Sequence, residues 1–320
     1  MTNHNLLKLK QSYPLDMKVE LTKQAIRDFI DVYGLEGVYI PFSGGKDSTV
    51  LLHICYEMYG NSIPAIFSNT KNEFNSIIQQ VKDTNNWYGN VHTVMSDKSI
   101  ADVIKVHGYP VVSKKTSRMI RDLQNPTEKN AATRKLYSTG IKQDGTKSNH
   151  FKLAEKHKYL IDAPFRISEK CCDELKKKPM KKYERETGRK PIIATMAVES
   201  KMRESSYLKH GCNNFTKGAS TPMGFWTEQD VLQYIVENNI KIASVYGDII
   251  FENGEYKTTG ESRTGCVACI LGMENERKCE KNRIQRLYDI EPKKYYYVVD
   301  TLGFRDVLEY MNYNYKVDDK

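Results

Sequence analysis

A short loop combines glycines, hydroxyls, a lysine and a carboxylate at a spacing that suits the phosphates of a nucleotide. Its residues are Ser43, Gly44, Gly45, Lys46, Asp47 and Ser48. Glycines let the backbone turn tightly and approach phosphate oxygens, and the amides that open a following helix point toward an anion. The lysine adds a cation, the serines add hydroxyls, and the aspartate can hold Mg²⁺ or cap the helix. We therefore predict a phosphate-binding site here.

Four of the seven cysteines form two pairs whose thiolates could serve one metal centre. Cys171 and Cys172 are adjacent, and Cys266 and Cys269 form a C-x-x-C pair that begins 94 residues after Cys172. Side chains of adjacent helical residues point about 100° apart, which suits two irons of a [4Fe–4S] cluster better than one small ion. Zinc, or no metal at all, stays open as an alternative because C-x-x-C alone does not separate these cases.

The remaining cysteines, Cys55, Cys212 and Cys279, are isolated in the sequence. Cys55 falls on the inward face of a predicted helix, so we interpret it as a small core hydrophobe. The chain shows no signal peptide at its start and no run of 18 apolar residues, so we expect neither export nor a membrane span. Seven cysteines without an export signal favour a reducing compartment, and we expect a cytoplasmic protein.

The elements around the phosphate loop predict an α/β fold. Helices are expected over residues 15–33, 47–58 and 74–84, with a further helix that begins in a Thr227–Asp230 capping box. Strands are expected at residues 38–40, 64–67, 91–95, 159–163 and 192–197. This alternation predicts a mostly parallel, Rossmann-like sheet with helices on both faces, plus a C-terminal, mainly helical region that carries the C-x-x-C pair. We expect a nucleotide-binding domain over residues 1–210 and the C-terminal region over residues 211–320.

Positive charge is concentrated in one stretch of the chain. Residues 105–158 contain thirteen Lys or Arg and four Asp or Glu, a difference of nine that equals the net charge of +9 for all 320 residues. We interpret the stretch as a basic insertion that suggests a polyanionic partner, although an ordinary solvated surface explains it equally well. Within it, residues 125–149 lack periodicity and are expected to form a mobile loop.

The loop at residues 43–48 is not a Walker A motif but resembles the PP-loop of the ATP pyrophosphatase superfamily. Taken with the cysteines, residues 38–295 resemble the phosphoadenosine phosphosulfate (PAPS) reductase-like branch of that superfamily. The segments that carry the resemblance, besides the loop, are residues 67–73, 108–115, 170–176, 199–203, 226–231 and 263–269.

This resemblance implies a set of site residues. Catalytic roles fall to Lys46, Asp47 and Arg203. Contacts with an adenine nucleotide, bound with Mg²⁺, fall to residues 43–48 and to Thr70, Lys114, Glu199, Ser200 and Arg263. The four paired cysteines would ligate a [4Fe–4S] cluster, as they do in family members that have all four.

Two departures from the sulfonucleotide reductases of the family favour ATP as the substrate. Those enzymes carry a nucleophilic cysteine in a C-terminal Glu-Cys-Gly sequence, whereas the last cysteine here is Cys279. They also have a degraded phosphate loop, whereas the loop here is intact. The chain looks closer to the ATP pyrophosphatase component of DNA phosphorothioation systems and to tRNA thiolation enzymes.

We therefore predict an enzyme that cleaves ATP to AMP and pyrophosphate and so drives sulfur insertion into DNA, tRNA or a small acceptor, with a sulfur donor protein as partner. A PAPS or adenylyl sulfate reductase that releases sulfite is one alternative. A non-catalytic regulator that senses nucleotide and redox state is another, from a different class.

Overall fold

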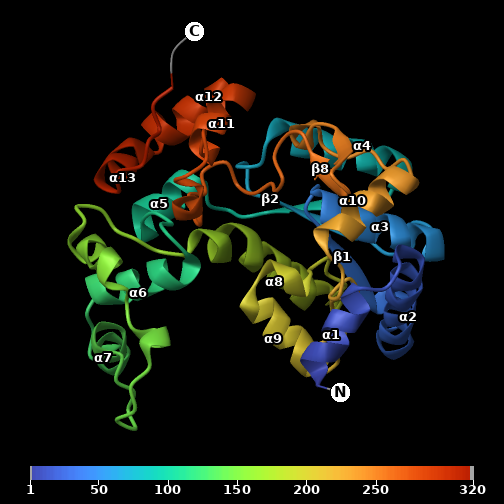
Figure 1. Cartoon of the computed structure of the whole chain (residues 1–320), viewed down its shortest axis with the longest axis horizontal. Coiled ribbons are helices and arrows are strands. Elements are labelled where there is room, and N and C mark those ends of the chain that lie inside the picture. Colours follow the sequence, from blue (N-terminus) through green and yellow to red (C-terminus); the bar gives the residue numbers. More distant parts are fainter. Residues whose placement is uncertain (1, 318–320) are drawn as a thin grey trace. The chain divides into compact units, whose positions relative to one another are not determined.

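The computed structural model describes residues 2–317, which form two compact units. Unit 1 comprises the residues up to Asn69, Glu73–Met95 and Pro179–Thr264. Unit 2 comprises Thr70–Asn72, Ser96–Lys178 and the residues from Gly265 onward. The sequence analysis divided the chain at residue 210 by predicted role rather than by compactness, and that division stays a prediction. Figure 1 shows the course of the chain.

Unit 1 is built on a parallel sheet of four strands in the order β3-β2-β1-β4. Its strands are β1 (Val38–Phe42), β2 (Ala65–Asn69), β3 (Val91–Met95) and β4 (Lys190–Pro191). The register pairs Ile40 with Ala65 and Val38 with Lys190, so β1 lies between β2 and β4. The predicted class, a mostly parallel α/β sheet covered by helices, is confirmed.

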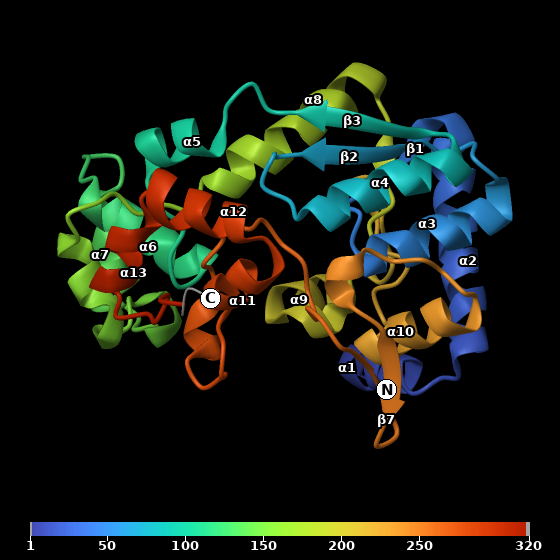
Figure 2. The ribbon, with the colours of Figure 1, turned by 90° about the horizontal axis from the view of Figure 1, so that it is seen from above.

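Helices cover both faces of this sheet (Figure 2). The helices before, between and after the strands are α1 (Asn3–Gln11), α2 (Leu15–Tyr33), α3 (Lys46–Tyr59), α4 (Asn75–Tyr88), α8 (Lys178–Thr187), α9 (Lys201–His210) and α10 (Glu228–Glu237). Alternate residues of β1 face opposite sides, as a strand requires. Ile40 joins the core beneath α3, whereas the Tyr39 hydroxyl on the other face donates to Glu184 of α8 at 2.8 Å. Two antiparallel hairpins complete the unit: β5 (Asn213–Asn214) with β6 (Ala219–Ser220), and β7 (Ile249–Glu252) with β8 (Glu255–Thr258).

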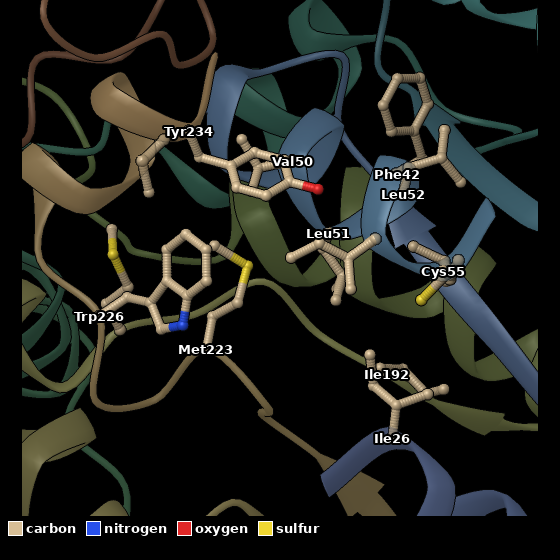
Figure 3. Packing of buried hydrophobic residues seen from close by; sticks show 14 of the residues in the cluster. Ile26, Phe42, Val50, Leu51, Leu52, Cys55, Ile192, Met223, Trp226 and Tyr234 are labelled. Carbon is tan, nitrogen blue, oxygen red and sulfur yellow. The ribbon is translucent and has the colours of Figure 1, made fainter. Parts of the chain in front are cut away.

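The core of unit 1 packs the buried faces of α2 and α3 against β1 and α10 (Figure 3). Leu51 of α3 and Trp226 are fully buried there, and the Trp226 indole donates to the Thr22 hydroxyl at 2.8 Å. One ion pair is also buried, because Lys18 of α2 bonds both carboxylate oxygens of Asp230 at 2.7 Å. Asp230 also completes a capping box with Thr227, so the start of α10 is fixed as the sequence predicts.

Unit 2 is mainly helical. Its α-helices are α5 (Ile100–His107), α6 (Lys114–Gln124), α7 (Ala131–Thr139), α11 (Arg283–Ile290), α12 (Pro292–Tyr296) and α13 (Phe304–Tyr310). Aromatic contacts link distant segments, as when the Tyr109 ring meets Phe304 edge-on at 5.0 Å. The Tyr109 hydroxyl also donates to the Leu302 carbonyl at 2.9 Å.

Three local predictions are wrong. Residues 155–162 form a 3₁₀ helix rather than a strand at 159–163, because His157 and Leu160 turn inward at a spacing of three residues. No strand forms over residues 192–197. The strand of this region, β4, ends at Pro191, and Ile192 makes only an isolated bridge to Ser220. Residues 125–149 contain helix α7, which buries Tyr137 and ends at Gly140 in a left-handed conformation.

Candidate functional site

The topology of the sheet places two predicted segments at one location. The chain runs outward from β1 to β2 and β3, while β4 pairs with the opposite side of β1. Ligands of open parallel sheets bind beyond the carboxyl ends of the strands, where the strand order reverses. The phosphate loop follows β1 and the segment with Glu199 and Arg203 follows β4, so both leave the sheet at this point.

The phosphate loop is shaped by its two glycines. Gly44 has a φ of +72°, and a Cβ there would lie 3.0 Å from Ile77 and Val81 of α4. Gly45 is the N-cap of α3, and a Cβ there would lie 3.1 Å from the Tyr246 hydroxyl. The loop therefore needs glycine twice, once for conformation and once for space.

The two loop serines hold the turn closed. Their hydroxyls lie 2.9 Å apart, and the Ser43 amide donates to the Ser48 hydroxyl at 3.2 Å. The Ser48 hydroxyl in turn donates to the Gly45 carbonyl at 2.9 Å. The first turn of α3 consequently presents its backbone donors at the end of β1, the arrangement that binds an anion.

Lys46 opens α3 and is 2% exposed, so its charge must be compensated within the protein. Its ammonium donates to the Ser262 carbonyl at 2.9 Å and lies 3.2 Å from Glu228 Oε1. Its backbone amide donates to the Tyr246 hydroxyl at 3.2 Å. Both nitrogens that would contact phosphate oxygens are therefore bonded to oxygens of the protein itself.

Asp47 is the acidic residue of the loop. Burial raises the pKa of its carboxyl, while Lys46 and Arg263 act in the opposite direction. Among the described residues its Oδ1 has no hydrogen-bond partner, and Lys46 Nζ lies 3.6 Å away. A buried carboxylate oxygen without a donor is a suitable ligand for Mg²⁺, so the residues fit the predicted cation.

Two arginines are held together by one carboxylate. Glu199 pairs with Arg203 and accepts from Arg263 Nη2 at 2.8 Å, while its other oxygen accepts from the Met196 amide. Burial, followed by the charge of Arg263, lowers the pKa of Arg203. Ser200 caps α9 by accepting from the Arg203 amide at 3.3 Å. Paired guanidinium groups with one counter-charge form a site of net positive charge, suited to phosphate.

All four paired cysteines lie in unit 2 and influence one another. A hydrogen bond from Cys171, with added charge from Lys114 and Lys176, lowers the pKa of the Cys172 thiol to about 5. The same hydrogen bond, with burial and the charges of the other three thiols, raises the pKa of Cys171.

The C-x-x-C pair belongs to the same group of thiols. Cys266 and Cys269 close a turn, in which the Cys269 amide donates to the Cys266 carbonyl at 3.0 Å. Cys266 Sγ also lies 3.7 Å from the Thr70 hydroxyl. Burial raises the pKa of Cys269, and Cys266 and Cys172 add to the effect. The thiols drawn from the two pairs are therefore close enough to interact.

The fit of this group to a metal differs between one ion and a cluster. Across residues 2–317 no three His, Cys, Asp or Glu side chains are arranged to hold a single ion. Thiolates on one zinc lie about 3.8 Å apart, as a Zn–S bond of about 2.3 Å in a tetrahedron requires. A four-iron cluster binds each thiolate at a different iron and accepts a wider arrangement. The chemistry of the four donors fits such a cluster, whose presence stays a prediction.

The predicted site residues thus fall into two groups. Unit 1 brings together the phosphate loop, Glu199, Ser200, Arg203 and Arg263, while unit 2 contains Thr70, Lys114 and the four cysteines. Sequence reasoning missed Tyr246, Ser262 and Glu228, which bond Lys46 from positions 182 to 216 residues away and carry no motif. The interpretation of Cys55 as a core residue is confirmed, since it is fully buried and burial raises its pKa to about 12.

The basic stretch at 105–158 includes α6 and α7 of unit 2. Some of its charges are neutralised within the unit. Arg121 bonds Asp122 at 2.8 Å and Glu169 at 2.5 Å, and Lys156 bonds Glu274 at 2.7 Å. A nucleic-acid partner for the remaining charges stays a prediction.

Unit 1 is thus a parallel α/β fold with the loop of residues 43–48 at the point where the strand order reverses. Residues 37–133 match the sequence profile of the phosphoadenosine phosphosulfate reductase domain. Over these residues the chain is similar to the PAPS reductase domain.

The chain is similar to the crystal structure of phosphoadenylyl-sulfate (PAPS) reductase from Candida auris in its phosphate complex, with 13% sequence identity and a TM-score of 0.40. The alignment covers 70% of this chain and 82% of that one. No curated protein matches the chain in sequence. Within the described residues, no helix is long and apolar enough to cross a membrane.

We predict that Gly44→Ala destabilises the protein by about 2–4 kcal/mol, because it combines a left-handed conformation with a clash against α4. Gly89→Ala is the matched control: Gly89 has a φ of +73° but only an ordinary 3.5 Å contact with Asn61. It should lose about 1 kcal/mol. Urea unfolding of both variants measures the difference, and equal losses would contradict the proposed close approach of the loop to α4.

We predict that Asp47→Asn stabilises the ligand-free protein at pH 7. Because the folded pKa of Asp47 is raised, the folded state holds this proton more firmly than the unfolded chain does. The contribution of the carboxyl to stability therefore falls as pH rises above its unfolded pKa of about 3.9. Thermal midpoints measured from pH 4 to pH 8 should separate variant from wild type increasingly at high pH. Asp31→Asn, at an exposed aspartate of α2, is the control for loss of a carboxylate charge.

Proposed function

We propose that the protein cleaves ATP between its α and β phosphates to activate an oxygen atom that sulfur then replaces. The observation that carries this proposal is the intact loop of residues 43–48 at the start of α3, where Lys46 offers two donors, its ammonium and its backbone amide. An ammonium ion and helix amides at one location can bind the β and γ phosphates of a triphosphate.

Four of the predicted site residues of unit 1 have a role in this reaction. The acceptor oxygen attacks the α phosphorus, the bond between the α and β phosphates breaks, and pyrophosphate leaves with the electron pair. Lys46 and the pair Arg203 and Arg263 stabilise the charge that develops on the leaving pyrophosphate. Asp47 would hold Mg²⁺, which would supply positive charge to the phosphates. Sulfur from a donor protein then displaces AMP from the adenylylated acceptor.

The four cysteines of unit 2 would ligate a [4Fe–4S] cluster in this proposal. When bound, the cluster would hold or pass sulfur, or brace the site. The mutual influence of the four thiols within unit 2 supports one shared metal centre, which would bind them as thiolates. Lys114 and Lys176 supply positive charge that favours the thiolate of Cys172.

The acceptor in this proposal is a nucleic acid, DNA or tRNA, bound in the cytoplasm. The supporting observation is the excess of positive charge in residues 105–158, of which only part is paired within unit 2 by the bonds of Arg121 and Lys156. Binding through such charges should weaken as salt is raised.

A second function, reduction of PAPS or adenylyl sulfate with release of sulfite, is favoured by the family match over residues 37–133. It needs a nucleophilic thiol. Cys279 is exposed and lies in unit 2, so it is the available candidate within the chain. An external thiol is the other candidate. If Cys279 is the nucleophile, Cys279→Ser should abolish sulfite release. A regulator without turnover would instead bind nucleotide and form no product.

We predict that anaerobically purified protein converts ATP, in the presence of Mg²⁺, to AMP and pyrophosphate. Lys46→Met should reduce the rate by roughly 10²–10³-fold, because a charge that stabilises the transition state is lost. Lys217→Met, at an exposed lysine of the same unit, is the control. Chromatographic separation of the nucleotides measures the products from ATP, adenylyl sulfate and PAPS in parallel. Sulfite release from a sulfonucleotide with ATP untouched would overturn the proposal in favour of the reductase.

We predict that reconstitution with iron and sulfide under anaerobic conditions gives about four irons per chain and an absorption band near 400 nm, in accord with a [4Fe–4S] cluster. Replacing any of Cys171, Cys172, Cys266 or Cys269 by alanine should abolish or strongly reduce iron binding. Cys279→Ser serves as the matched control and should retain it. Stoichiometric zinc with no iron would contradict the cluster and support the zinc alternative.

A further inference from the structure

A ribbon of two antiparallel segments begins beside the phosphate loop. Its outer part is the hairpin β7–β8, and its base continues the pairing to residues 245 and 261. At the base the Gly260 amide donates to the Tyr246 carbonyl at 2.8 Å, and the Glu261 amide donates to the Val245 carbonyl at 2.9 Å. The ribbon is therefore one hydrogen-bonded body from its base to its tip (Figure 2).

Two glycines let the strands of the base approach closely. A Cβ on Gly260 would lie 2.4 Å from the Val245 carbonyl oxygen, and one on Gly247 would lie 2.3 Å from the Thr259 hydroxyl. Neither position tolerates a side chain without displacement of the other strand. This packing fixes where Tyr246 and Ser262 emerge from the base.

Both residues place oxygen atoms on the donors of the phosphate loop. The Tyr246 hydroxyl accepts from the Lys46 amide and also bonds the Thr264 hydroxyl at 2.8 Å. The Ser262 carbonyl accepts from the Lys46 ammonium at 2.9 Å. A phosphate at the start of α3 needs these same two donors, so ribbon and phosphate compete for them.

The first turn of α10 holds loop and ribbon together. Glu228 pairs with the Lys46 ammonium at 3.2 Å. The next residue, Gln229, bonds the backbone of Tyr256 in β8 twice, accepting from its amide at 2.7 Å and donating to its carbonyl at 3.0 Å. The closed position of the ribbon thus depends on polar contacts at its base, on one side chain of α10 and on the burial of Val245 and Tyr246.

We propose that the ribbon of residues 245–262 is a lid that occupies the phosphate loop in the nucleotide-free protein and is displaced when a polyphosphate binds. The proposal rests on the function proposed above, since it takes the loop to be a nucleotide site. Tyr246 is a competing acceptor in the closed state. In the outer part of the lid Phe251 is 64% exposed, whereas Ile249 packs against the core of unit 1.

Only molecules with an open lid bind nucleotide, so the apparent Kd equals the Kd of the open form divided by the fraction of molecules that are open. Tyr246→Phe removes the competing hydroxyl and retains the ring. A net hydrogen bond lost from the closed state should raise the open fraction, so the Kd should fall about three- to tenfold. Gln229→Ala removes the two bonds to β8 and leaves the partners of Lys46 in place, so it should also lower the Kd. Tyr256→Phe, a tyrosine of the same ribbon whose backbone alone bonds Gln229, is the matched control.

The experiment is calorimetric titration of the full chain with α,β-methylene-ATP and Mg²⁺, which avoids cleavage, with thermal midpoints recorded for each variant. Tighter binding by Tyr246→Phe and Gln229→Ala, with Tyr256→Phe unchanged, supports the lid. Unchanged or weaker binding by Tyr246→Phe, with wild-type protein binding normally, overturns the lid and leaves the proposed function standing. Failure of wild-type protein to bind the analogue overturns the proposed function and the lid with it.

Discussion

Burial of the Lys46 ammonium is the constraint on which the architecture of unit 1 depends. A charge that is 2% exposed needs partners, and α3 alone provides only Asp47. The other partners come from α10 and from the chain beyond the β7–β8 hairpin. Because those segments must return to the carboxyl end of β1, the last third of unit 1 is folded around a residue in its first quarter.

The two groups of predicted site residues differ in charge, because the group in unit 1 is cationic and the group in unit 2 consists mainly of thiols. Unit 1 gathers cations, Lys46 with Arg203 and Arg263, and moderates them with single carboxylates such as Glu199. Unit 2 gathers thiols: a hydrogen bond between Cys171 and Cys172 raises the pKa of Cys171 and, with the charges of two lysines, lowers the pKa of Cys172. A triphosphate suits the first group and a positively charged metal centre suits the second, so each lacks the charge that its expected ligand provides.

Local sequence patterns predicted the helices and strands whose formation depends on residues close together in the sequence. The apolar spacing of residues 15–33 and 91–95 gave α2 and β3 with the correct bounds, and the capping box gave the start of α10. The strand expected at 159–163 failed because a short apolar run has no periodicity that separates strand from 3₁₀ helix. Tyr246 and Glu228 were beyond prediction, since their role comes from contacts about 200 and 180 residues distant rather than from neighbours in sequence.

The bond between Lys46 and the Ser262 carbonyl spans 216 residues, and this separation has a consequence for synthesis. At about 5–20 residues per second, roughly 10–40 s pass between translation of the loop and translation of its last partner. During that interval the glycine turn can form on the ribosome, while its ammonium has neither Ser262 nor Glu228 available. For that interval the nascent chain therefore carries the Lys46 side chain without two of the partners that surround it in the finished protein.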